Sequence, residues 1–181
     1  ELNFNGPIKE HYFDDYKDAG FTCIRLPVNW GNNTEVDAPY SIDENWMSQV
    51  EQVIDWALER DLFIILNGHH EDWLKKDFEN KKLRKRYKSI WKQISETFKG
   101  RSERLFFEMI NEPVGMSKEQ VDKLNAEILP IIRKKNPTRI VVYSGREWCG
   151  PEHLFEVKIP RDDYIMGYFH SYDPWSFAGE G

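Results

Sequence analysis

The most chemically suggestive stretch of the chain is the apolar run 105–110, which ends in Asn111, Glu112 and Pro113. The run has the length of a buried strand, and the proline ends it because proline has no N–H to continue the ladder. A carboxyl group at the end of a buried strand is a candidate general acid or base. The neighbouring amide can hydrogen-bond a hydroxylated ligand. A solvated Glu112 in an ordinary strand-ending turn is the alternative interpretation.

Polar and aromatic side chains follow four other apolar runs in the same way. Arg25 lies late in run 21–28, and Trp30 follows that run. The others are Asn67, His69, His70, Glu71, Asp72 and Trp73 after 62–66, Ser144, Arg146, Glu147 and Trp148 after 139–143, and His170, Tyr172, Asp173 and Trp175 after 164–169. The carboxyl ends of parallel strands converge on one face, so these side chains are predicted to form a single site.

Helical patterns separate these strands. Apolar spacing predicts helices over 8–19 and 83–98, and capping boxes predict two more, one at Ser41-Ile42-Asp43-Glu44 and one at Ser117 with Gln120. Strands that alternate with helices indicate an α/β fold with a parallel sheet, either doubly wound or a (β/α)₈ barrel. No glycine-rich loop follows the first strand, which disfavours dinucleotide binding. No linker is visible, so residues 1–181 are predicted to form one domain.

Composition narrows the possible partners. The chain has 181 residues, 40% hydrophobic and 31% charged, which suits a globular protein. Its net charge of −6 comes with no basic stripe, so a nucleic acid is not an expected partner. No apolar run approaches the ~20 residues that cross a bilayer. The two cysteines lack metal-ligand spacing.

Tryptophan is abundant, with seven residues in the chain. Trp30, Trp73, Trp148 and Trp175 fall in predicted loops. Sugar rings have apolar faces that stack on indoles, so these four are candidate carbohydrate contacts. The alternative is that each is a half-buried packing residue.

Four motifs together resemble glycoside hydrolase family 5, the cellulase and mannanase family. They are Arg25 within Ile24-Arg25-Leu26-Pro27-Val28-Asn29-Trp30, the pair His69-His70, Asn111-Glu112-Pro113, and His170-Ser171-Tyr172-Asp173-Pro174. The likeness runs from about Pro7 to the end of the chain. It implies a (β/α)₈ barrel that hydrolyses β-1,4-linked glucan by a retaining mechanism, outside the cell, without cofactor or metal.

The resemblance also implies roles for individual residues. Glu112 would be the general acid/base, and Asn111 would bind a sugar hydroxyl. His69 and His170 would line the catalytic subsite, and Arg25 and Tyr172 would hydrogen-bond the nucleophile. His70 and Trp175 would help to bind sugar.

One departure from the family's pattern is the missing nucleophile, a glutamate on the seventh barrel strand. The sequence ends at Gly181, and residues 1–6 could be only the loop leaving the first strand. We therefore expect five strands, the second to the sixth of the barrel, and an isolated chain with no activity. Glu71, Asp72, Glu147 and Glu180 are other carboxylates, but none lies on the nucleophile's strand.

This departure has electrostatic and structural consequences. Without the second carboxylate, Arg25 would lack its usual partner and Glu112 would ionise more easily. The two open edges of a five-stranded sheet predict association with a second copy or with a complementary barrel fragment, or else marginal stability.

Three rival functions remain open. A carbohydrate-binding module would bind sugar through the tryptophan and asparagine side chains without hydrolysing it. A metal-dependent hydrolase would use His69, His70, Glu71 and Asp72, although adjacent histidines in a strand point to opposite sides. A structural fragment would have no activity of its own and would associate with itself or with a partner. The choice among cellulose, mannan and other glucans is also open.

Overall fold

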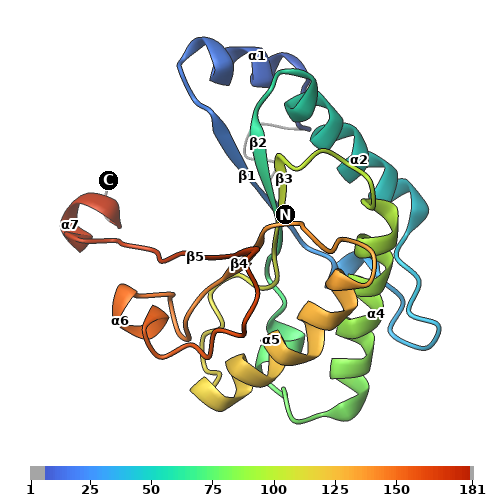
Figure 1. The fold of residues 1–181 in the computed structure, drawn as a ribbon, viewed down its shortest axis with the longest axis vertical. Helices are drawn as coiled ribbons and strands as arrows, with labels where there is room; N and C mark the ends of the chain where they lie inside the picture. The colour runs from blue at the N-terminus through green and yellow to red at the C-terminus, as the bar shows by residue number, and fades with distance from the viewer. Residues whose placement is uncertain (1–6, 180–181) are drawn as a thin grey trace.

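Five parallel strands form one sheet in the order of the chain (Figure 1). The structure is a computed structural model that describes residues 7–179. The strands are β1 (Cys23–Val28), β2 (Phe63–Gly68), β3 (Leu105–Glu108), β4 (Val141–Tyr143) and β5 (Ile165–Gly167). Each pairs in parallel with the next. The predicted α/β fold, strand number and strand order are confirmed. The predicted loop at 1–6 lies outside the described residues.

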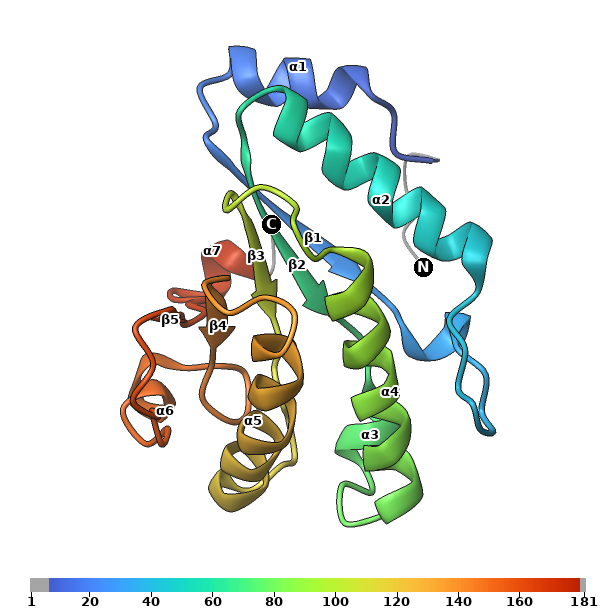
Figure 2. The ribbon, with the colours of Figure 1, turned by 45° about the vertical axis from the view of Figure 1, so that its right-hand side comes forward.

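Long helices lie along one side of this sheet (Figures 1 and 2). The helices are α1 (His11–Asp18), α2 (Glu44–Glu59), α3 (Asp72–Lys75), α4 (Lys81–Thr97), α5 (Lys118–Arg133), α6 (Pro151–Leu154) and α7 (Trp175–Ala178), with a 3₁₀ turn η1 at Gly31–Asn33. The turn η1 and the helices α3 and α7 were not predicted, because one turn is too short to show a helical period.

The predicted helix caps were half right. The capping box of Ser117 and Gln120 opens α5, as expected. At α2 the cap is Asp43, whose side chain accepts a hydrogen bond from the Trp46 N–H at 2.8 Å. Ser41 instead belongs to the preceding loop, where its N–H donates to Glu35 Oε2 at 3.1 Å. The capping box expected at Ser41 is therefore wrong.

The two faces of the sheet differ. Ile64 and Phe107 are fully buried, and the ring of Phe107 packs on Trp91 of α4 with centroids 5.7 Å apart. On the opposite face Phe63 is 37% exposed and packs against half-buried Phe106. That second face would be the interior of a barrel. It is apolar toward the amino ends of the strands and turns polar at their carboxyl ends.

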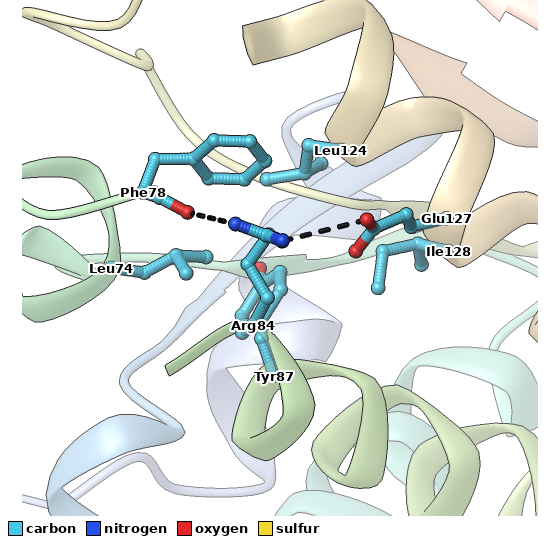
Figure 3. A pocket seen from close by; sticks show the side chains of 7 residues that line it. All are labelled: Leu74, Phe78, Arg84, Tyr87, Leu124, Glu127 and Ile128. Atoms are coloured by element: carbon cyan, nitrogen blue, oxygen red, sulfur yellow. Dashed lines mark hydrogen bonds and ion pairs between the residues drawn. The ribbon is translucent and has the colours of Figure 1, made fainter. Parts of the chain in front are cut away.

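The helices also pack on one another away from the strand ends. Figure 3 shows a small cavity between α3, α4 and α5 into which Arg84 extends. The Arg84 guanidinium donates to the Phe78 carbonyl at 2.8 Å and pairs with Glu127 at 3.4 Å. Leu74 and Leu124 line the same space. Arg84 thus joins the helices, and none of the predicted site residues lines this cavity.

A second arginine fixes the loop after β1 to α4. Arg86 donates to the carbonyls of Gly31 at 2.7 Å, Thr34 at 2.5 Å and Glu35 at 2.9 Å. Gln93, two turns later on α4, accepts from the Ile42 N–H and donates to the Tyr40 carbonyl. The loop 29–43 is therefore held by side chains of one helix.

The sheet has two open edges within residues 7–179. The edge strand β1 pairs only with β2, and β5 pairs only with β4, as predicted. Over the same residues, every helix is too short or too polar to span a bilayer.

Candidate active site

The site is built at the carboxyl ends of the strands, around Glu112. Beyond the end of β3, the Asn111 N–H donates to the Gly68 carbonyl at 2.8 Å and so ties this segment to the end of β2. Glu112 follows with a positive φ of 34°, and His70 and Glu147 at neighbouring strand ends also have positive φ. Such backbone angles are costly for non-glycine residues and cluster at functional sites.

Two predicted residues contact the Glu112 carboxylate directly. His170 Nδ1 lies 2.6 Å from Glu112 Oε1, and the Tyr172 hydroxyl donates to the same oxygen at 3.0 Å. A carboxylate only accepts hydrogen bonds, so His170 donates from Nδ1. Tyr172 was expected to serve a nucleophile, and in this structure it binds Glu112 instead. The prediction that Glu112, His170 and Tyr172 lie together on one face is confirmed.

These contacts shift the pKa of Glu112. Partial burial raises it, but hydrogen bonds from His170 and Tyr172, together with the charge of His170, outweigh burial, so the pKa of Glu112 is lowered overall. The direction agrees with the sequence-based expectation. The expected cause was the missing second carboxylate, whereas in the structure hydrogen-bond donors stabilise the Glu112 anion.

A second cluster, centred on Glu108, was not predicted. Glu108 is 1% exposed and accepts from Arg25 Nε at 2.8 Å, Arg25 Nη2 at 2.6 Å, Asn67 Nδ2 at 3.1 Å and the Tyr168 hydroxyl at 2.7 Å. Arg25 also donates to Asn111 Oδ1 at 2.7 Å. Arg25, which was expected to lack its usual partner, the nucleophile, pairs with Glu108 instead. The Arg25 link to Asn111 connects the Glu108 cluster to the residue beside Glu112.

The sequence itself contains a signal for the cluster around Glu108. Asn67 and Glu108 are register partners in β2 and β3, two residues beyond the partners Ile65 and Phe106. With the period of two of a strand, both polar side chains fall on the interior face. A buried carboxylate there needs a cation, and Arg25 supplies it from β1.

His69 and His70 come just after β2. Their rings meet edge to face with centroids 4.4 Å apart, so the expectation that they point to opposite sides is wrong. That expectation assumed a strand, but β2 ends at Gly68 and His70 has a φ of 56°. Burial, with the charges of His70 and Arg25, lowers the pKa of His69 to about 4. His69 is therefore uncharged at neutral pH.

The four candidate tryptophans divide by burial. Trp30 is 0% exposed and its Nε1 donates to the Asn67 carbonyl, so it offers no face to a sugar and the expected sugar contact is wrong. Trp73 is half-buried, with Arg86 4.5 Å from its ring. Trp148 and Trp175 are each 61% exposed. Trp175 packs beside Tyr172 with centroids 6.1 Å apart, which brings it next to the Glu112 group.

The other carboxylates have structural or peripheral places. Glu71 is fully buried and accepts from the backbone N–H groups of Trp30 and Gly31 and from Trp73 Nε1. Burial raises the pKa of Glu71 to about 7 against the pull of these donors. Asp72 is exposed, and Glu147 lies 3.9 Å from Arg146. Glu180 lies outside the described residues.

The metal alternative finds no support in the side-chain geometry. Across residues 7–179, no group of three or more His, Cys, Asp and Glu side chains is arranged to hold an ion. Glu71 is occupied by three N–H donors, which leaves the proposed set of His69, His70, Glu71 and Asp72 without its buried carboxylate.

Comparison with known proteins gives the family. Residues 3–181 match the model for cellulase (glycosyl hydrolase family 5). The chain is 48% identical to endoglucanase H of Acetivibrio thermocellus, over 98% of this chain and 20% of that protein. It is 33% identical to endoglucanase A of Clostridium longisporum, over 98% of this chain and 38% of that protein. The chain thus spans well under half the length of these relatives.

Solved structures of family 5 enzymes are also similar to this chain. A tri-modular family 5, subfamily 4 endo-β-1,4-glucanase from Bacillus licheniformis superposes with a TM-score of 0.89 at 44% identity, covering 96% of this chain and 35% of that one. Thermotoga maritima Cel5A, in complex with mannotriose, gives a TM-score of 0.93 at 30% identity, covering 99% of this chain and 58% of that one. The five strands therefore correspond to part of a (β/α)₈ barrel. The chain belongs to glycosyl hydrolase family 5, the cellulase family.

Proposed function

We propose that these residues supply the acid/base half of a retaining site that hydrolyses β-1,4-linked glucan, with Glu112 as general acid/base. The observation that carries the proposal is the position of Glu112 at a barrel strand end, held by His170 and Tyr172. Related proteins named endoglucanases support the substrate class. Structures of relatives in complex with cellotetraose and with cellobiose support it further.

The neighbouring residues have separate proposed tasks. Asn111 accepts from Arg25 through Oδ1, which leaves its amide N–H₂ to donate to a sugar hydroxyl. His69 and His170 line the subsite where the bond breaks. His70, Trp73, Trp148 and Trp175 contact sugar units farther along, and the exposed indoles of Trp148 and Trp175 suit stacking best.

The proposed chemistry needs a second carboxylate about 5–5.5 Å from Glu112. Glu112 would give its proton to the glycosidic oxygen while the second carboxylate attacks the anomeric carbon and the leaving sugar departs. Glu112 would then take a proton from a water that hydrolyses the glycosyl–enzyme bond. A nearby anion would also raise the pKa of Glu112, opposing the effect of His170 and Tyr172.

We infer that the second carboxylate comes from outside these 181 residues. Glu108 is saturated by Arg25, Asn67 and Tyr168, and Glu71 by three N–H groups, so neither is available to attack a sugar. The isolated 181-residue chain should therefore bind glucan and hydrolyse it negligibly. Sugar binding without turnover is then the function of this chain alone, favoured by its exposed tryptophans.

Two further proposals concern partners and location. The open edges at β1 and β5 favour pairing with the rest of a barrel or with a second copy. We also infer that the protein works outside the cell, because its proposed substrate is a polymer too large to enter.

The test compares sugar release from a soluble β-1,4-glucan by the 181-residue chain with and without a fragment that carries the remaining strands of a family 5 barrel. We expect turnover only in the mixture, and loss of that turnover in Glu112→Gln, because an amide cannot donate and retake the proton. Glu147→Gln is the matched control, since Glu147 also follows a strand with positive φ. Equal loss in both variants, or turnover by the chain alone, would contradict the proposal.

A further inference from the structure

The side-chain amide of Asn67 has a fixed orientation. Asn67 is fully buried, and its Oδ1 accepts from the Val28 N–H at 3.4 Å. Its Nδ2 faces Glu108 Oε1 at 3.1 Å. Exchanging the two ends of the amide would set an oxygen against the Glu108 carboxylate and an N–H₂ against the Val28 N–H. The amide nitrogen therefore points toward Glu108.

The same nitrogen also faces His69. Asn67 Nδ2 lies 3.3 Å from His69 Nδ1. An amide N–H₂ has two hydrogens and no acceptor lone pair, so its two acceptors here are Glu108 Oε1 and His69 Nδ1. His69 Nδ1 must then carry a lone pair. The imidazole proton is left on Nε2.

We propose that Asn67 is a positioning residue that holds His69 as the Nε2–H tautomer, so that His69 offers the cleft an N–H donor. Glu108 and Val28 hold Asn67 in turn. The acceptor that meets this N–H would be a sugar hydroxyl oxygen. This choice of acceptor rests on the proposed function. The tautomer itself does not depend on turnover.

The charges around His69 favour an uncharged ring, which is the state in which a tautomer is defined. His70, Arg25 and Lys75 act with burial to lower the pKa of His69 to about 4, while the charge of Glu108 acts in the opposite direction. Protonation of His69 would also place a hydrogen on Nδ1 against the Asn67 N–H₂. Geometry and charge thus both favour an uncharged His69 ring without a proton on Nδ1.

His170 provides an internal contrast. Its Nδ1 faces the Glu112 carboxylate at 2.6 Å, so that nitrogen carries a proton. Two histidines of one site are therefore expected to be protonated on different nitrogens. His11, which is exposed on α1 and meets only the ring of Tyr12 edge to face among the ring contacts, serves as the exposed reference histidine.

The experiment is a long-range ¹H–¹⁵N correlation spectrum of the 181-residue chain with ¹⁵N-labelled histidine at pH 7. His69→Gln assigns the His69 signals by their disappearance. We expect His69 Nδ1 at the shift of an unprotonated nitrogen, with an Nε2–H preference roughly fivefold above that of His11, the effect of one hydrogen bond. We expect His170 Nδ1 to be protonated. A proton on His69 Nδ1, or a His69 ratio equal to that of His11, would overturn the proposal.

A substitution at Asn67 tests whether this residue sets the tautomer of His69. Asn67→Leu keeps the size of the side chain and removes both N–H donors, so the excess of the Nε2–H form of His69 should fall about fivefold. The His170 signals should stay as they are. A folded variant with an unchanged His69 ratio would refute the role of Asn67. Should the variant not fold, the wild-type spectrum still decides, and neither readout depends on whether the chain hydrolyses glucan.

Discussion

Removal of the Glu108 carboxylate should be among the most destabilising single changes in the sheet. Glu108→Ala leaves Arg25, Asn67 Nδ2 and the Tyr168 hydroxyl without their shared acceptor. Breaking a buried ion pair from one side costs roughly 3–5 kcal/mol. The Arg25 side chain is 30% exposed, so water recovers part of its solvation and we expect a loss of about 3 kcal/mol.

Urea unfolding measured by tryptophan fluorescence checks this value. With a slope of about 2 kcal/mol per molar urea, the midpoint should fall by roughly 1.5 M. Asp37→Ala is the matched control, because the Lys82–Asp37 pair has the same 2.6 Å length as Arg25–Glu108 but lies in solvent. Its midpoint should not move measurably. If Glu108→Ala shifts the midpoint no more than Asp37→Ala, Glu108 does not organise the strand ends as argued.

Three further changes have distinct expected outcomes. Because the pKa of Glu71 is raised to about 7, the folded state binds more protons than the unfolded one between about pH 4.5 and 7. Stability should therefore fall by about 2.5 kcal/mol as pH rises from 5 to 8, and urea midpoints at the two values should show a smaller fall in Glu71→Gln. Ser117→Ala removes the capping box of α5 and should cost about 1 kcal/mol in the same assay, whereas Ser41→Ala, at the predicted cap that does not form, should cost less. Trp175→Ala should weaken cellotetraose binding in a calorimetric titration while leaving the urea midpoint unchanged, because the indole is 61% exposed; unchanged affinity would remove Trp175 from the proposed cleft.

The predicted parts of the site were those set by position along a strand. Glu112 and His170 each follow an apolar run, and parallel strands bring such ends together although the two residues are 58 positions apart in sequence. The alternation of helix and strand indicated a parallel sheet, and the resemblance to a barrel family supplied the order of its strands.

The missed parts depend on partners that lie far apart in sequence. Glu108 looked like an interior residue of a strand because its cation, Arg25, is 83 residues away. Trp30 and Trp148 both lie in loops, where no period distinguishes a buried ring from an exposed one. The cap of α2 was misplaced because Ser41 and Asp43 are both good cap residues and only the turn geometry selects between them.

The attachment of loop 29–43 to α4 has a consequence for motion. Arg86 and Gln93 hold carbonyl and N–H groups of that loop from one helix, so the loop cannot open by itself without losing these bonds. Slow amide exchange in the loop would then follow the opening of α4 and would not show the fast local fraying usual for a surface connection. The side of the site next to β1 would therefore behave as a rigid wall.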